Sequence, residues 1–115
     1  MMERIPTLTD DGYPTVATLR EIREWEIEGN ADIRALLDYC REAWWHQESF
    51  GVPRHVKIVD RETWISASTG GWSGNEAIIE ALQGNTMFWN ICWLRSDRGG
   101  HFRFLARPLA EDKNV

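Results

Sequence analysis

The residues best suited to ligand contact lie in a glycine-rich stretch, residues 68–76, with the sequence STGGWSGNE. Three of the nine glycines fall within five positions here, after a strand-like run and before a short helical run. Glycine lacks a Cβ atom and tolerates positive φ angles, so such a turn lets a ligand approach the backbone closely. The first turn of the following helix carries unpaired amides and a partial positive charge, so an anion could bind at this corner.

The start of that helix is indicated by Ser73 and Glu76, which have the spacing of a capping box. The stretch has neither the GxxxxGK[ST] pattern of a phosphate loop nor the GxGxxG pattern of a dinucleotide site. An alternative remains open, in which the turn only reverses the chain and Trp72 fills the core. The site hypothesis requires Trp72 to be exposed.

Residues that commonly serve in catalysis or metal binding do not form a recognisable set. His46, His55 and His101 lack the spacing of a zinc motif such as HExxH. Cys40 and Cys92 form no CxxC pattern, and both occupy apolar positions, so we expect buried thiols. The sequence therefore predicts no metal, no cofactor and no catalytic residue.

Two weaker catalytic patterns occur near the glycine-rich stretch. Ser73 misses the GxSxG nucleophile pattern by one position, and the chain is short for that enzyme class. Glu76 and Glu80 share one helix face at i, i+4, a spacing that could serve acid–base chemistry or hold a cation. Helix capping explains Glu76 more simply, so the sequence favours a non-enzymatic protein without excluding an enzyme.

The bulk composition is that of a single globular domain, residues 1–115. The chain is 43% hydrophobic and 27% charged, and its length can bury a core without disulfides. It has no apolar run of about 18 residues, and its first residues, MMER at 1–4, lack an apolar signal-peptide core. We expect a cytoplasmic protein without a membrane span, with residues 1–13 as an extended lead-in and 108–115 as a flexible tail.

The net charge of −5 is unevenly distributed. Residues 1–50 contain eleven acidic and five basic residues, whereas residues 51–115 contain seven acidic and eight basic ones. The acidic half disfavours nucleic acid and could face a basic protein, or could simply be a solvated helix surface. Four arginines lie close to aromatic residues near the C-terminus, a composition that single-strand nucleic-acid platforms share: Arg95, Arg98, Arg103 and Arg107.

Two helices are expected in the N-terminal half. The first has Thr15 as N-cap and ends at Gly29-Asn30, and the second runs from residue 31 or 32 to about Gln47. Apolar residues of the second helix recur at i, i+3, i+4, i+7: Ile33, Leu36, Leu37, Cys40, Ala43 and Trp44. Tyr39, Trp45 and His46 flank that stripe and could edge a groove.

The C-terminal half alternates strands with one short helix. The expected strands are residues 54–60, 63–68, 86–95 and 101–106, with a loop at 49–53 and a turn at 96–100. The run 86–95 is apolar on both faces, so we expect a strand that is central in the sheet or covered on both sides. A helix at about 75–83 closes at Gly84 or Asn85. The order ααββαββ predicts an α+β fold, with about four antiparallel strands covered by two N-terminal helices and one short helix.

Several segments resemble a group of small uncharacterised proteins encoded by tailed bacteriophages. They are DGYPT at 11–15, STGGWSGNEAIIEAL at 68–82 and RGGH at 98–101. The resemblance covers most of residues 11–106 and implies a small soluble accessory protein that works inside an infected bacterium. It carries no specific function, although phage proteins of this size often bind a host or defence component.

The sequence therefore predicts a non-enzymatic binding protein with a protein partner and Trp72 as the anchor. The predicted contact residues combine the glycine-rich stretch with the turn at 98–101: Thr69, Gly70, Gly71, Trp72, Ser73, Gly74, Asn75, Glu76, Arg98 and His101. The main alternative is a pocket for a phosphate-bearing small molecule, such as a nucleotide, at the start of the third helix. Single-strand nucleic-acid binding by the arginine-rich hairpin is a further alternative.

Overall fold

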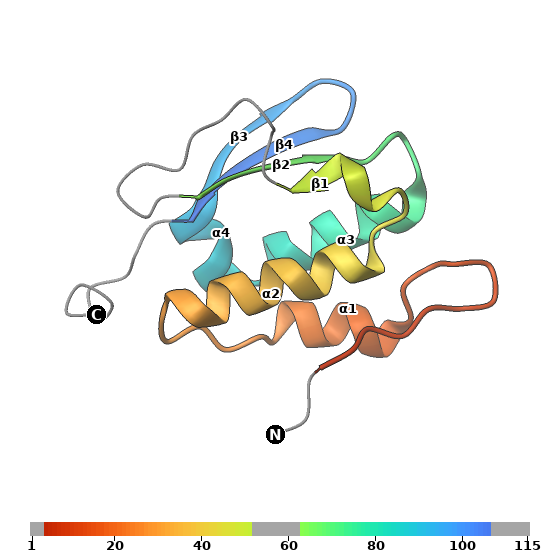
Figure 1. Ribbon diagram of the computed structural model, residues 1–115, viewed down its shortest axis with the longest axis horizontal. Coiled ribbons are helices and arrows are strands. Elements are labelled where there is room, and N and C mark those ends of the chain that lie inside the picture. Colours follow the sequence, from red (N-terminus) through yellow and green to blue (C-terminus); the bar gives the residue numbers. More distant parts are fainter. Residues whose placement is uncertain (1–3, 52–62, 107–115) are drawn as a thin grey trace.

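The computed structural model describes residues 4–51 and 63–106, and these form an α+β fold (Figure 1). Four α-helices and four antiparallel strands occur within those residues. In chain order the elements are α1 (Val16–Arg23), α2 (Asn30–Ala43), a 3₁₀ turn η1 (Gln47–Ser49), β1 (Phe50–Gly51), β2 (Thr63–Ser68), α3 (Ser73–Gly84), α4 (Thr86–Cys92), β3 (Trp93–Asp97) and β4 (His101–Ala106). The predicted fold class is confirmed, with one more helix than expected.

The sheet has the strand order β1-β2-β4-β3, so β2 and β4 are central. β2 and β4 pair from Thr63 opposite Ala106 to Ser68 opposite His101. Because side chains alternate along a strand, this register puts apolar residues of both strands on one face. The helices pack against that face, and α1 lies farthest from the sheet (Figure 1). The tight turn between β3 and β4 occurs at residues 98–100, as predicted.

α1 begins where the sequence indicates, because the Thr15 side chain accepts a hydrogen bond from the Thr18 amide. The predicted end at Gly29-Asn30 is wrong, since α1 ends at Arg23. A distant side chain makes the early end possible: the buried amide of Asn85 donates to the carbonyl oxygens of Ile22 and Trp25, both at 3.0 Å. These bonds hold carbonyl groups at the last turn of α1 and just beyond it, where intrahelical amide donors are no longer present.

α2 is the element that the sequence describes best, because every residue of its predicted apolar stripe is buried. It begins at Asn30, where the Asp32 carboxylate accepts from the amides of Glu28 and Gly29. It ends at Ala43 rather than near Gln47, since Trp44 has an extended backbone. The predicted loop at 49–53 is also wrong in part, because residues 50 and 51 form β1 and pair with β2.

The predicted central strand at 86–95 is the largest error. Its first part is helix α4, and only its last part joins β3, which is an edge strand. Asn85 caps α4 by accepting a hydrogen bond from the Phe88 amide, and Phe88 and Cys92 bury the same face at i, i+4. An apolar run with both faces hydrophobic fits a buried strand and a short buried helix equally well.

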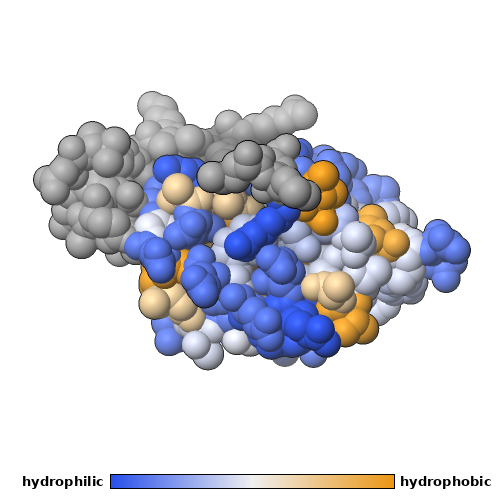
Figure 2. Space-filling view, turned by 90° about the horizontal axis from the view of Figure 1, so that it is seen from below, coloured by the Kyte–Doolittle hydropathy of each residue, from blue (hydrophilic) through white to orange (hydrophobic). Residues whose placement is uncertain are grey.

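The core lies between the sheet and the helices and is largely aromatic and aliphatic. Its largest fully buried apolar side chains are Phe50, Phe88, Phe104, Ile22, Ile33, Leu36, Ile78 and Leu82. Seen from the α1 side, the described surface is mainly hydrophilic, with hydrophobic residues in small separate groups (Figure 2). That side therefore fits a solvated helical surface. The predicted strand at 54–60 and the tail at 108–115 lie outside the described residues.

Candidate functional site

The glycine-rich stretch forms a tight turn between β2 and α3. Gly70 and Gly71 have φ angles of 65° and 76°, and the Trp72 amide donates to the Thr69 carbonyl oxygen at 3.1 Å. Two successive positive φ angles are those of a type I′ turn, which glycine adopts without strain. The Gly71 amide also donates to the Thr69 hydroxyl oxygen at 3.3 Å. Thr69 thus occupies two amides that an anion would otherwise use.

The same turn is joined to the β3–β4 turn, so the structure brings together the two segments of the predicted site. The Thr69 amide donates to the Gly100 carbonyl oxygen at 2.9 Å, and the Ser68 hydroxyl lies 2.8 Å from His101 Nδ1. Gly100 has a φ of 79°, and a Cβ atom there would overlap the Thr69 hydroxyl oxygen. Thr69 is buried, whereas Arg98 and His101 are exposed.

The predicted capping box at the start of α3 is wrong. The N-cap is Trp72, whose side chain makes no capping hydrogen bond, and Ser73 is the first helical residue. Glu76 is exposed in the first turn, and its amide donates to the Trp72 carbonyl oxygen at 3.1 Å. The Trp72 ring lies so close to Gly74 that a Cβ atom at that position would overlap it. Gly74 is therefore needed to let the indole fold over the helix start.

Trp72 is half-buried and belongs to an exposed aromatic cluster rather than to the core. Its ring stacks on Tyr13, with 4.8 Å between ring centroids and 25° between planes, and lies 5.2 Å from the ring of Trp45. Tyr13 and Trp45 are 39% and 49% exposed. We call Tyr13, Trp45 and Trp72 the aromatic corner. It lies at the end of the molecule where the β2–α3 turn meets the α2–β1 connection (Figure 1).

Tyr13 is presented by a hydrogen-bonded turn in the N-terminal segment. The Thr9 amide donates to the Tyr13 carbonyl oxygen at 2.7 Å, and the Tyr13 amide donates to the Thr9 hydroxyl oxygen at 3.1 Å. Leu8 and Pro14 form a β-bridge below this turn. The sequence did not indicate that Tyr13 belongs to the site, because its ring contact with Trp72 joins segments that are far apart in the chain.

Trp45 is held by Asn75, a buried residue of α3. The Asn75 side-chain oxygen accepts from the Trp45 amide at 2.9 Å, and its nitrogen donates to the carbonyl oxygens of Trp45 at 3.1 Å and Thr69 at 3.3 Å. One side chain therefore fixes both the Trp45 backbone and the glycine turn. Asn75 was predicted as a contact residue, but it is only 1% exposed and positions its neighbours instead.

His46 extends the aromatic corner on one side. Its ring centroid lies 4.1 Å from that of Trp45, and its Nδ1 atom lies 3.2 Å from a Glu48 carboxylate oxygen. It is the only non-glycine residue with positive φ in the described part of the chain, at 62°. A hydrogen bond from the main chain of Glu48 lowers the pKa of the Glu48 carboxyl, and the hydrogen bond to the His46 imidazole lowers it further. Tyr39, Trp45 and His46 were predicted to edge a groove. The structure puts Trp45 beside Trp72 and His46 against Trp45, whereas Tyr39 is buried in the core against Trp25.

The two thiols are poorly suited to catalysis, and the described residues contain no cluster that could hold a metal ion. Cys40 and Cys92 are buried; burial raises the pKa of Cys40 strongly and that of Cys92 to about 12. A thiol with so high a pKa is a poor nucleophile at neutral pH. Over residues 4–51 and 63–106, no three His, Cys, Asp or Glu side chains lie close enough to hold a metal ion.

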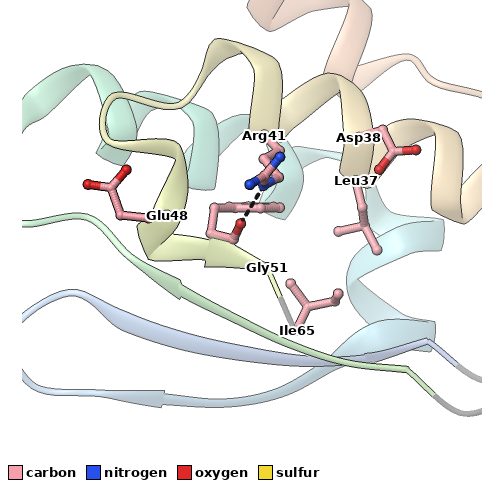
Figure 3. Close-up of a pocket in the computed structure, with 7 residues that line it drawn as sticks. Leu37, Asp38, Arg41, Glu48, Gly51 and Ile65 are labelled. Atoms are coloured by element: carbon pink, nitrogen blue, oxygen red, sulfur yellow. Dashed lines mark hydrogen bonds between the residues drawn. The ribbon is translucent and has the colours of Figure 1, made fainter. Parts of the chain in front are cut away.

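A pocket of about 310 Å³ lies between α2, β1 and β2 (Figure 3). Its charged lining residues are Asp38, Arg41 and Glu48. The Arg41 side chain points toward β1, and its Nε atom donates to the Phe50 carbonyl oxygen at 3.0 Å. Because Arg41 already holds β1 against α2 and lies between two acidic residues, this pocket is poorly suited to an anion.

In the described residues, no helix is both long enough and apolar enough to cross a membrane. Comparisons of the chain with protein-family models, with curated proteins and with solved structures give no significant match.

Proposed function

We propose that this protein is a non-enzymatic binding protein that contacts a protein partner through the aromatic corner and the adjoining glycine turn. The observation that carries the proposal is the stacking of three partly exposed aromatic rings from three separate segments. Tryptophan and tyrosine dominate contact energies at protein interfaces, because they bury large areas with few rotatable bonds. The resemblance to phage-encoded proteins suggests a cytoplasmic accessory protein whose partner is a host or phage macromolecule.

The rigidity of the aromatic corner supports the same proposal. Asn75 fixes the backbone of Trp45, the Thr9 turn fixes Tyr13, and Gly74 lets Trp72 pack against α3. Side chains that are already ordered lose little conformational entropy when a partner binds. An exposed aromatic surface of this kind would be an aggregation risk if it had no use.

The phosphate-pocket alternative has less support. Two amides of the glycine turn are bonded to Thr69, the Trp72 ring covers Gly74, and Glu76 adds a negative charge at the helix start. A thermal-shift screen with nucleotides and inorganic phosphate tests this alternative directly, and we expect no rise in Tm at millimolar ligand. A rise with several phosphate compounds would favour the pocket over the protein interface.

Nucleic-acid binding by the hairpin is also a weaker alternative. The Arg95 guanidinium pairs with the Asp97 carboxylate at 2.7 Å, which offsets part of the basic charge of β3. A gel-shift assay with single-stranded DNA and RNA at low salt should show no retardation. Retardation that weakens with added salt would support this alternative instead.

Two matched tryptophan variants test the proposed interface. Trp45 and Trp93 are exposed to similar extents, 49% and 43%, but Trp93 lies on β3 and stacks on Trp89. We expect Trp45→Ala to lose at least tenfold of partner recovery in quantitative affinity purification from host lysate, whereas Trp93→Ala retains it. Trp72→Ala should also lose the partner but should lower the Tm more, because Trp72 is half-buried.

Circular dichroism and thermal melting of each variant provide the control for folding. The proposal fails if Trp45→Ala remains folded and recovers the same proteins as the wild type. It also fails if Trp45→Ala and Trp93→Ala lose the same proteins, because that result would indicate non-specific adhesion by exposed indoles.

A further inference from the structure

The three segments that form the aromatic corner have an unusual charge composition. Residues 5–19, 42–51 and 63–94 contain no lysine and no arginine. The same segments contain six acidic residues: Asp10, Asp11, Glu42, Glu48, Glu76 and Glu80. The exposed aromatic rings therefore belong to segments whose only formal charges at neutral pH are negative.

The structure places four of these acids on the elements that present the rings. Asp10 and Asp11 lie in the turn that carries Tyr13. Glu48 contacts the His46 ring, which itself lies against Trp45. Glu76 is in the first turn of α3, the helix that begins directly after Trp72. All four carboxylates are on exposed residues.

A surface that combines aromatic faces with carboxylates attracts cations in two ways. The π face of an indole or phenol attracts an ammonium or guanidinium group, and the carboxylates add charge attraction and speed association. The same chemistry already occurs within this protein, where the Arg4 guanidinium lies 4.2 Å from the ring centroid of Trp25. An acidic partner segment would be repelled by Asp10, Asp11 and Glu76, whereas the nearby Arg41 offsets part of the charge of Glu48.

We infer that the partner contacts the aromatic corner with a basic peptide segment, whose arginine or lysine side chains lie on the exposed faces of Trp45 and Tyr13. This inference rests on the proposed function, because it names the chemistry of the partner at the same site. The charge complementarity selects a basic segment over an acidic or a purely apolar one. Arginine is the better match of the two cations, because its planar guanidinium stacks on aromatic rings.

Synthetic peptides provide the probes for a direct test. The full chain, labelled with ¹⁵N, is titrated at low salt with an arginine-rich peptide, a lysine-rich peptide, a citrulline-substituted peptide of the same length and a glutamate-rich peptide. We expect saturable shifts of backbone amides in residues 9–13, 45–48 and 69–76 and of the Trp45 and Trp72 indole N–H signals. The citrulline and glutamate peptides should leave these signals unchanged.

Three variants connect those shifts to the named groups. Trp45→Ala should weaken arginine-peptide binding about tenfold, since cation–π contacts are strongest on tryptophan. The double variant Asp10→Asn with Asp11→Asn should weaken it about threefold, and raised salt should reduce that difference. Trp93→Ala, which removes an exposed indole on β3, should bind like the wild type.

Two outcomes would overturn the inference. Equal shifts with the citrulline and arginine peptides would show that positive charge is not recognised. Absence of binding by every basic peptide, while Trp45→Ala still abolishes capture of the partner from lysate, would reject the basic segment but leave the proposed interface intact. Failure of the proposed function itself is recognised separately, by unchanged capture with the folded Trp45→Ala variant.

Discussion

Replacement of Asn75 by alanine tests whether one buried amide organises the aromatic corner. The Asn75 side chain is 1% exposed and makes three hydrogen bonds, all with main-chain groups of Trp45 and Thr69. Alanine would leave the partly buried Trp45 amide and two carbonyl oxygens without this partner, at a cost of about 3 kcal/mol. The better helix propensity of alanine returns about 0.5 kcal/mol. The expected net loss of unfolding free energy is therefore about 2.5 kcal/mol.

Urea denaturation followed by circular dichroism measures this loss, and the Tm should fall by about 10 °C for a domain of this size. Asn90→Ala is the matched control, because Asn90 is also helical but exposed on α4, and its effect should stay within about 0.5 kcal/mol. Hydrogen exchange adds a local measurement: the Trp45 amide should be protected in the wild type and exchange rapidly in Asn75→Ala. A loss below about 1 kcal/mol with a protected Trp45 amide would refute the reasoning.

Three further substitutions or treatments have defined expectations. Gly100→Ala should lower the free energy of unfolding in urea by about 2 kcal/mol or more, because φ is 79° and the new Cβ atom would overlap Thr69. Gly99→Ala should lower it less, because φ is similar, at 87°, but the new Cβ atom would lie 3.4 Å from its nearest neighbour, the His101 ring. Asn85→Ala should cost about 3 kcal/mol, since its side chain caps α4 and bonds two carbonyl groups of the α1 end; a cost similar to an exposed Asn→Ala change would contradict this role. Cys92 should resist iodoacetamide at pH 8 in the native state, as checked by peptide mass mapping. Burial raises the pKa of the Cys92 thiol from 9.0 to about 12. The stability that the buried, protonated thiol contributes is therefore complete below pH 9 and is lost as the pH rises toward 12.

The α+β class could be predicted because most of the helices and strands carry a periodic pattern of apolar residues in their own sequence. The α2 stripe at i, i+3, i+4, i+7 and the strand at residues 63–68 are confirmed, and Thr15 caps α1 as expected. The errors fall where local patterns are ambiguous. Apolar residues at 86–92 fall on both faces of a strand, so the periodic pattern alone does not decide between a helix and a strand. The hydrogen bond that the Phe88 amide donates to the Asn85 side chain caps the helix that the structure shows.

The candidate site was only partly predictable. Glycine density pointed to the turn at 69–74, and the proximity of that turn to the β3–β4 turn follows from the pairing of β2 with β4. Tyr13 could not be assigned to the site from the sequence, because its stacking on Trp72 links residues far apart in the chain. Whether Trp72 was a core residue or an exposed anchor depended on the same contact, and the structure shows it half-buried between Tyr13 and Trp45.

The sequence alone determined the α+β class, the helical stripe of α2, the cap at Thr15 and the sharp turns at the glycine pairs. These features depend on interactions between near neighbours, for which the residue types are sufficient evidence. Only the tertiary structure decided where α1 ends, that α4 is a helix, and that Tyr13, Trp45 and Trp72 share one surface. The end of α1 and the placement of Trp45 depend on Asn85 and Asn75, whose side chains bond distant main-chain groups, and the placement of Tyr13 depends on its ring contact with Trp72. The helical form of residues 86–92 goes with the burial of Phe88 and Cys92 in the core. Such contacts between distant segments have no signature in the local sequence.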